Sequence, residues 1–238
     1  MSAPDAAAGG EEFVTHPLLR ECGVAHGFGL RGSPPVPALA RPHQVHGRAV
    51  ARAQDPRQPL GDADAVVTGA PGLAVGIVTA DCLPLLVAAD AGRVVAAVHA
   101  GWRGLAEGVI EAALAALRAE ADAGAALVAA VGPHVGPCCY EVDAPVLSAL
   151  ARRFGDGLDA ALRPSRPGHA RLDLAQLALR ELEANGIASE SLGVVPDPCT
   201  RCDAERYHSY RRDGARAGRL VHWIRSGARG VDTASAPP

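Results

Sequence analysis

The chain has 238 residues, of which 48% are hydrophobic and 21% are charged, a composition typical of soluble globular proteins. A formal net charge of −3 argues against a basic surface for nucleic acid or anionic lipid. No apolar run reaches the roughly 18 residues of a membrane span, and residues 1–12 lack the basic and apolar segments of a secretory signal. We therefore expect a cytoplasmic protein without nucleic-acid or membrane partners, folded over residues 13–226 between disordered tails at 1–12 and 227–238.

The first predicted element is a short strand over residues 24–30, which leads into a proline-rich loop over residues 34–59. Long regular elements are disfavoured there, because proline lacks a backbone N–H donor. Within this loop, the β-branched residues Val45 and Val50 indicate a short strand around His46.

The centre of the chain contains two apolar runs, residues 73–78 and 93–98, which predict two strands. The turn after the first run carries Cys82 and is closed by Pro84, and the turn after the second begins with His99. Reactive side chains commonly follow strand ends, where the sheet fixes the backbone and the turn exposes the side chain. We therefore expect the Cys82 thiol and the His99 imidazole to lie close together.

The second half of the chain alternates helices and strands. Apolar residues at 105, 109, 110, 113, 114 and 117 form a stripe along one face of a helix over residues 105–118. No internal repeat and no linker divides the chain, so we predict a single α+β domain with mixed β-sheets and flanking helices. The other predicted elements are a strand at 127–131, a helix at 143–154, a helix at 174–184, a strand at 192–195 and a strand at 219–224.

Two imidazoles and one thiol, those of His46, Cys82 and His99, form the strongest candidate metal site. These ligands suit Zn²⁺, and three protein ligands leave a fourth position for water or substrate, as in catalytic zinc sites. Zinc lowers the pKa of water bound at such a position to about 7. The alternative is that Cys82 is a buried apolar residue and the histidines are ordinary polar residues, since their spacing matches no short metal motif.

Cys82 could instead be a nucleophile with His99 or His46 as its base, as in a cysteine hydrolase or an acyl-transfer enzyme. The residue types alone do not separate this hypothesis from zinc binding. His46, Cys82 and His99 are therefore the candidate catalytic residues under both hypotheses.

Four further cysteines occur as an adjacent pair, Cys138 and Cys139, and as a CxxC motif, Cys199 and Cys202. A structural Cys₄ zinc site normally pairs two CxxC motifs, and adjacent cysteines make a poor second half. We therefore expect these four thiols to serve packing or loop structure and to bind no metal.

Three arginines, Arg103, Arg211 and Arg212, could bind an anion such as phosphate, because guanidinium is a bidentate donor. Arg103 lies within a glycine-flanked segment ahead of a predicted helix, where free N–H groups favour negative charge. We select Arg103 and Arg212 as candidate substrate- or anion-binding residues. The alternative for each arginine is a solvated surface position or a structural salt bridge.

Seven motifs, taken in order, resemble those of the laccase-domain (multicopper polyphenol oxidoreductase-like) family of purine nucleoside phosphorylases. The resemblance covers about residues 24–225, and TADCLP followed by HAGWRG is its most specific part. The motifs are QVHG (44–47), DADAVVT (62–68), TADCLPLL (79–86), HAGWRG (99–104), GPHVGPCCYEV (132–142), LDL (172–174) and CTRCDAERYHSYRRDG (199–214).

The resemblance implies an αββα sandwich and one zinc ion on His46, Cys82 and His99, with Cu²⁺ as an alternative ion. It implies phosphate-dependent cleavage of adenosine, inosine and S-methyl-5'-thioadenosine to the free base and ribose 1-phosphate or its methylthio analogue. It also implies deamination of adenosine to inosine. One departure concerns the segment before Gln44, which is shorter than in typical members and has no clear counterpart of an Asn-Arg pair. Arg31 and Arg41 are the nearest substitutes for that arginine.

The sequence therefore predicts a zinc-dependent purine nucleoside phosphorylase with adenosine deaminase activity. The alternatives are a copper-dependent polyphenol oxidase, a cysteine hydrolase that uses Cys82 and His99, and a non-catalytic zinc-dependent binding partner. A true multicopper oxidase would need more paired histidines than the nine present, so we expect oxidase activity only as a side reaction of copper in the zinc site. The motifs lie at strand ends rather than on an exposed apolar face, which favours catalysis.

Overall fold

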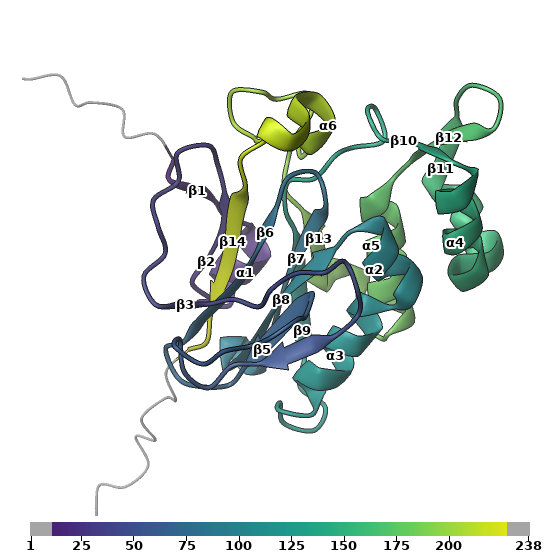
Figure 1. Ribbon diagram of the computed structural model, residues 1–238. Coiled ribbons are helices and arrows are strands. Elements are labelled where there is room, and N and C mark those ends of the chain that lie inside the picture. Colours follow the sequence, from purple (N-terminus) through teal and green to yellow (C-terminus); the bar gives the residue numbers. More distant parts are fainter. Residues whose placement is uncertain (1–10, 228–238) are drawn as a thin grey trace, which may run out of the picture.

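The computed structural model describes residues 11–227, and a six-stranded mixed sheet forms its centre (Figure 1). Every position of the two central strands, β7 and β8, is buried. Their side chains alternate between a core shared with helices and a core shared with a second sheet, which is why both strands are apolar throughout. In spatial order the strands are β13 (Leu192–Val194), β9 (Leu127–Val131), β7 (Leu83–Ala89), β8 (Val94–Ala100), β5 (Ala65–Thr68) and β4 (Val50–Arg52).

A five-stranded sheet covers one face of the six-stranded sheet. In β14 the side chains of Leu220, His222 and Ile224 are buried, whereas those between them are partly exposed. This alternation is typical of a sheet with one covered face. In spatial order the strands are β1 (Phe13–Val14), β2 (His26–Gly29), β14 (Leu220–Arg225), β6 (Ala74–Thr79) and β3 (Leu39–Ala40).

Helices cover the remaining face of the six-stranded sheet, where α2 and α3 contact β8 and α5 packs beside α3. The helix layer and the two sheet layers of the expected αββα order are thus present. The short helix α1 contacts β9. These layers confirm a single α+β domain with mixed sheets and flanking helices. The helices are α1 (Pro17–Glu21), α2 (Trp102–Glu107), α3 (Val109–Arg118), α4 (Ala144–Phe154), α5 (Leu174–Ala184) and α6 (Tyr210–Asp213), with 3₁₀ turns at Asp90–Gly92, Gly155–Ala161, Ser189–Ser191 and Gly214–Arg216.

The helix expected over residues 105–118 is two helices, α2 and α3, which meet at Gly108. Gly108 has a φ of 85°, a left-handed conformation that ends a helix readily only at glycine. The guanidinium of Arg153 lies 2.8 Å from where a Cβ would project at this position. The apolar stripe predicted the buried face correctly but not the break, because the stripe continues in phase across it.

Two strand predictions differ from the structure. The turn expected to close at Pro84 is shorter, because Pro84 lies inside β7, where Leu83 already pairs with Ala100. The strand expected around His46 is absent from the described residues, and β4 begins only at Val50. A small three-stranded sheet that the sequence did not predict consists of β10 (Glu141–Asp143), β12 (His169–Leu172) and β11 (Leu162–Pro164).

The expected tails at 1–12 and 227–238 lie almost entirely outside the described residues. Among helices of residues 11–227, none combines the length and the apolar character needed to cross a bilayer.

Candidate functional site

The backbone brings His46, Cys82 and His99 together from three separate segments. Cys82 lies in the turn between β6 and β7, and His99 lies near the end of β8. Because β7 and β8 are antiparallel, with Pro84 opposite His99, the turn before β7 is adjacent to the end of β8. His46 comes from the loop before β4 and has a φ of 64°, a left-handed conformation that is uncommon outside glycine and that is supported here by hydrogen bonds from the loop backbone to Asp64.

One donor atom from each of these three side chains lies within 4.8 Å of the others. The two imidazole rings meet edge to face, with centroids 4.8 Å apart and an interplanar angle of 76°. A Cβ at Gly101 would come within 3.1 Å of Cys82 Sγ and 3.4 Å of His46 Cδ2. Glycine at this position therefore leaves the space into which the thiol and the imidazole project.

Asp64 is a fully buried carboxylate that holds the ring of His99 and the backbone of His46. Its Oδ1 accepts the Nδ1–H of His99 at 2.7 Å, which directs Nε2 of that ring toward the other two side chains. The same carboxylate accepts the backbone N–H groups of His46 at 2.9 Å and of Gly47 at 2.7 Å. Sequence reasoning did not identify Asp64, although a lone acid within the apolar stretch at 63–67 was a usable signal.

The site is strongly polarised. Burial alone raises the pKa of Cys82, but hydrogen bonds with His46 and His99 outweigh it and lower the pKa to about 6. Burial alone lowers the pKa of His99, but hydrogen bonds with Asp64 and Cys82 outweigh it and raise the pKa to about 9. At neutral pH this arrangement is a thiolate beside an imidazolium, or a thiolate and an imidazole beside a metal cation.

The donor set fits a metal such as zinc. Two imidazoles and a thiolate are ligands that zinc accepts, and the Asp64–His99 hydrogen bond is the usual support of a metal-binding histidine. The three donors face a cavity of about 880 Å³, so a fourth ligand from solution has access to the same point.

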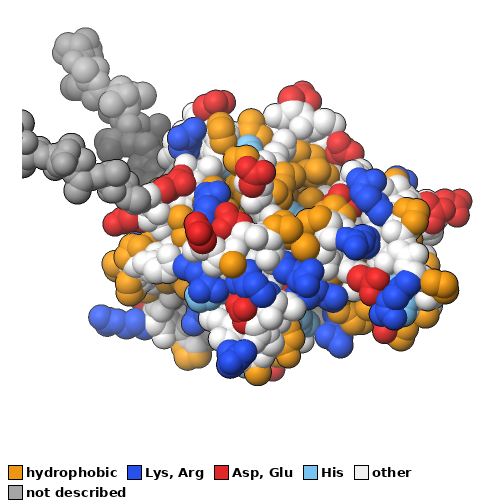
Figure 2. All heavy atoms as spheres, turned by 90° about the horizontal axis from the view of Figure 1, so that it is seen from above, with side chains coloured by type: hydrophobic (Ala, Val, Ile, Leu, Met, Phe, Trp, Pro, Cys, Tyr) orange, Lys and Arg blue, Asp and Glu red, His pale blue; other side chains and the backbone are white. Residues whose placement is uncertain are grey.

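Aromatic and cationic side chains line this cavity (Figure 2 shows the face of the molecule that carries it). The guanidinium of Arg103 stacks 4.5 Å from the centre of the Trp102 ring, and that of Arg211 stacks 4.9 Å from the centre of the Tyr140 ring. Burial raises the pKa of Tyr140, so its hydroxyl is protonated at neutral pH. The arginines that line the cavity are Arg41, Arg103, Arg211 and Arg219.

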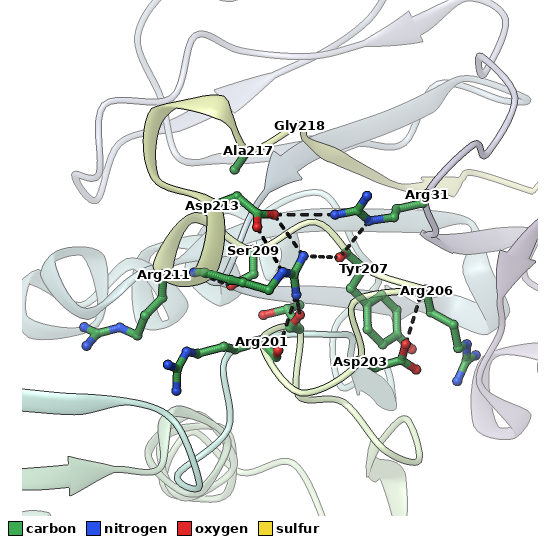
Figure 3. A network of polar contacts seen from close by, with 12 residues as sticks. Arg31, Arg201, Asp203, Arg206, Tyr207, Ser209, Arg211, Asp213, Ala217 and Gly218 are labelled. Carbon is green, nitrogen blue, oxygen red and sulfur yellow. Dashed lines mark hydrogen bonds and ion pairs between the residues drawn. The ribbon is translucent and has the colours of Figure 1, made fainter.

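Arg212, expected as an anion ligand, lies outside this lining. Its Nη1 donates to the carbonyl of Thr200 at 2.8 Å, its Nη2 donates to that of Tyr207 at 2.9 Å, and its Nε donates to Asp213 at 3.0 Å. Figure 3 shows this network, which Arg31 joins from the other side of Asp213. The guanidinium of Arg212 thus ties α6 to the segment that precedes it.

Arg211, the preceding residue in α6, extends away from the network that surrounds Arg212 (Figure 3) and lines the cavity. Of the two substitutes considered for the missing Asn-Arg pair, Arg41 lines the cavity and Arg31 belongs to the network. Adjacent residues on a short helix point in different directions, so the sequence alone could not separate Arg211 from Arg212.

The thiols of the adjacent pair and of the CxxC motif converge in the structure. One sulfur from each of Cys138, Cys139, Cys199 and Cys202 lies within 4.8 Å of the other three. This convergence contradicts the reasoning that adjacent cysteines make a poor half of a metal site.

The chain is similar to proteins of known family over most of its length. Residues 30–226 match the family described as multi-copper polyphenol oxidoreductase laccase. A purine nucleoside phosphorylase of Xylella fastidiosa strain 9a5c is 40% identical over 202 residues, which are 82% of this chain and 75% of that protein. The adenosine deaminase RL5 of an unknown prokaryotic organism is 30% identical over 195 residues, which are 78% of this chain and 74% of that protein.

Solved structures agree with these sequence matches. The crystal structure of Neisseria meningitidis protein NMB0706 superposes with a TM-score of 0.71 at 33% identity, covering 80% of this chain and 75% of the other. YlmD from Geobacillus stearothermophilus superposes with a TM-score of 0.74 at 27% identity, covering 81% of this chain and 75% of the other. Sequence and fold together show that this chain belongs to the multi-copper polyphenol oxidoreductase laccase family.

Proposed function

We propose that this protein is a zinc-dependent purine nucleoside phosphorylase that cleaves adenosine, inosine and S-methyl-5'-thioadenosine with phosphate and also deaminates adenosine. Relatives named purine nucleoside phosphorylase and adenosine deaminase support an enzyme of purine nucleoside metabolism. The observation that carries the proposal is the cavity, where His46, Cys82 and His99 face four arginines and several aromatic rings.

The arginines supply the charge that phosphate binding needs. Arg103 and Arg211 are each held over an aromatic ring, which limits the freedom of their guanidinium groups before an anion binds. Guanidinium groups neutralise the phosphate and orient one of its oxygens toward C1' of the nucleoside. The rings of Trp102, Tyr140 and Tyr210 line the same cavity and offer apolar faces on which a purine can stack.

The residues His46, Cys82 and His99 would hold the zinc ion. When bound, zinc supplies a Lewis acid that polarises a substrate oxygen or acidifies a water molecule. Asp64 keeps the proton of His99 on Nδ1, so the lone pair of Nε2 stays free to bind the metal. The side chains of His46 and Cys82 approach the same point, with the cavity on their open side.

Two other activities each have an observation in their favour. The lowered pKa of Cys82 beside His99 is the pairing that a cysteine hydrolase uses. The family description favours a copper-dependent polyphenol oxidase, and the same donor set accepts copper.

The deciding experiment is incubation of the purified protein with inosine in the presence and absence of phosphate, followed by chromatography of the products. The proposal expects hypoxanthine and ribose 1-phosphate only when phosphate is present. A hydrolase would release free ribose without phosphate, and an oxidase would turn over phenolic dyes with added copper while leaving inosine intact. Base release that does not depend on phosphate would overturn the phosphorylase assignment.

Arg103→Ala tests the anion contact. Loss of this guanidinium should raise the KM for phosphate more than the KM for inosine, because the charge acts on the anion. Arg57→Ala, at an exposed position outside the cavity lining, is the matched control and should change neither constant.

A further inference from the structure

We propose that Cys138, Cys139, Cys199 and Cys202 form a second, structural metal site that holds a thiophilic divalent cation, zinc in the first instance. The site is separate from the His46, Cys82 and His99 group, with which it shares no residue. It does not depend on the activity proposed above, because it concerns how two loops are joined.

The sheet brings the four cysteines together. Strands β9 and β13 pair in parallel, with Ala129 opposite Leu192 and Val131 opposite Val194, so the loops that follow them leave the same end of the sheet. Cys138 and Cys139 lie in the loop after β9, and Cys199 and Cys202 lie in the loop after β13.

Backbone hydrogen bonds join the two loops close to the cysteines. The N–H of His134 donates to the carbonyl of Pro198 at 2.8 Å, and the N–H of Thr200 donates to the carbonyl of His134 at 2.9 Å. These bonds fix the distance between the two chain segments, so the convergence of the thiols is set by the backbone.

Three of the separations between the sulfur atoms are close to those of a tetrahedral site. Cys138 Sγ lies 3.4 Å from that of Cys199 and 3.5 Å from that of Cys202, and the sulfurs of Cys139 and Cys202 are 3.4 Å apart. Four sulfurs about 2.3 Å from one zinc ion lie about 3.8 Å from each other, whereas a disulfide brings two sulfurs to about 2.05 Å. Thiol–thiol hydrogen bonds are weak, so a shared cation is the better reason for four thiols to converge.

Donors around the sulfurs suit thiolates. The backbone N–H of Gly136 donates to Cys199 Sγ at 3.3 Å, as expected at a metal-binding cysteine. Arg201 lies between Cys199 and Cys202 in the chain, and the side chain of Arg171 donates to the carbonyl of Cys138. Four thiolates around a divalent cation carry a net charge of −2, which these two guanidinium groups offset.

The proposed Cys₄ metal site would lie beside the cavity and would fix two of the residues that line it. Thr200, between the two CxxC cysteines, donates its hydroxyl to Asp81 at 2.6 Å, and Asp81 precedes Cys82. Asp81 also accepts the backbone N–H of Arg211 at 2.5 Å. Tyr140, which follows Cys139, lines the cavity under the guanidinium of Arg211. A metal that joins the two loops would therefore fix Tyr140 and Arg211 relative to Cys82.

Metal analysis of purified, reduced protein tests the proposal. The wild-type chain should hold two zinc ions, Cys82→Ala should hold one, and Cys199→Ser/Cys202→Ser should hold one. Cys22→Ser, which replaces a cysteine outside both clusters, is the matched control and should keep both ions. A Cys82→Ala variant that is folded but free of metal would overturn the second site, and so would intact-mass evidence of disulfides among the four cysteines in freshly prepared protein.

Cobalt substitution gives a readout that is independent of stoichiometry and of activity. In the Cys82→Ala background, Co²⁺ bound by four thiolates should give intense visible bands of a tetrahedral site together with thiolate charge-transfer absorption. Cys138→Ser in that background should weaken or shift these bands even if the double variant fails to fold. Unchanged spectra would place the cobalt elsewhere and refute the assignment. Absence of phosphate-dependent base release from the wild-type protein, in a preparation that holds both ions, would count only against the proposed activity.

Discussion

Gly101 lies where any side chain would reach the candidate metal ligands. A Cβ added at this residue would lie 3.1 Å from Cys82 Sγ, closer than carbon and sulfur normally approach. Gly101→Ala should therefore displace the thiol and weaken zinc binding at His46, Cys82 and His99 by about tenfold or more. Competition with a fluorescent zinc chelator measures the effect. Gly69→Ala, where a Cβ would make only ordinary contacts, is the control, and equal affinities in the two variants would contradict the prediction.

Asp64 should matter as much as a ligand although it touches no metal. Asp64→Asn replaces the acceptor of the His99 Nδ1–H with an amide that can turn its NH₂ group toward the ring, which would move the ring proton to Nε2, the nitrogen that faces the metal. We expect metal affinity to fall by about 10- to 100-fold with the fold retained. Asp62→Asn, at an exposed carboxylate paired with His43, should leave the affinity unchanged. Calorimetric titration with zinc compares the two variants.

At this scale the sequence identified the three side chains that converge, His46, Cys82 and His99, but not the residues that surround them. His46, Cys82 and His99 could be selected because their residue types are rare and chemically specific. Asp64 and Arg211 were harder to select, because what each one contacts depends on the direction of its side chain rather than on its type. The convergence of the four cysteines was missed for the same reason: the adjacency of Cys138 and Cys139 says little until β9 and β13 bring the two loops to one end of the sheet.

At the scale of elements, Arg153 connects its own helix, α4, to α3 and α5. Its guanidinium contacts Glu181 of α5 at 2.5 Å and Glu111 of α3 at 2.9 Å, and it lies against Gly108 between α2 and α3. Glu181 is only 5% exposed, and its Oε2 has no hydrogen-bond partner among the described residues. Burial raises the pKa of Glu181 and outweighs the opposing hydrogen bond from Arg153.

Arg153→Met should therefore lower the free energy of unfolding by about 3 kcal/mol, because it leaves a buried carboxylate without its cation. Urea unfolding followed by circular dichroism measures the change. Arg152→Met, at the exposed neighbouring position, should cost less than about 0.5 kcal/mol. Arg153→Met/Glu181→Gln should recover part of the loss, since no buried charge remains; a double variant less stable than the single one would argue that the arginine acts through packing alone.

The elements themselves were predictable to different degrees. Helices α4 and α5 and strand β9 lie at the expected residues, because their apolar periodicity and flanking residues agree. Strand β7 was obscured by Pro84, which reads as a turn residue although the strand continues through it. The break at Gly108 was hidden because the apolar stripe spans it, and only the left-handed backbone of that residue, with a φ of 85°, shows why glycine is favoured there.

At the scale of the whole molecule, buried histidines link the packing of the two sheets to pH. His222 of β14 is fully buried; its Nδ1 accepts the backbone N–H of Gly29 at 3.3 Å and its Nε2–H faces the hydroxyl of Thr79 at 2.8 Å. Burial lowers the pKa of His222 to about 3. Burial also lowers the pKa of His134, so several imidazoles stay neutral in the folded protein.

The sign of the pH effect follows from proton binding. Between about pH 6.5, where an unfolded histidine titrates, and about pH 3, the unfolded chain binds a proton at position 222 that the folded chain does not. Stability is therefore complete above about pH 6.5 and falls as the pH drops, by up to about 1.4 kcal/mol per pH unit from this residue. His222→Gln, which keeps hydrogen-bonding groups but does not titrate, should lose that part of the slope.

Urea midpoints of wild type and His222→Gln, compared from about pH 7 to about pH 5, test this prediction. The variant should be less stable at neutral pH yet show a shallower decline on acidification. Acid also releases metal from histidine ligands, but this affects both proteins alike, so the difference between the two slopes isolates position 222. His43→Gln, at an exposed ring paired with Asp62, should keep the wild-type slope. Parallel slopes for wild type and His222→Gln would mean that the imidazole between the sheets gains solvent or a partner on protonation.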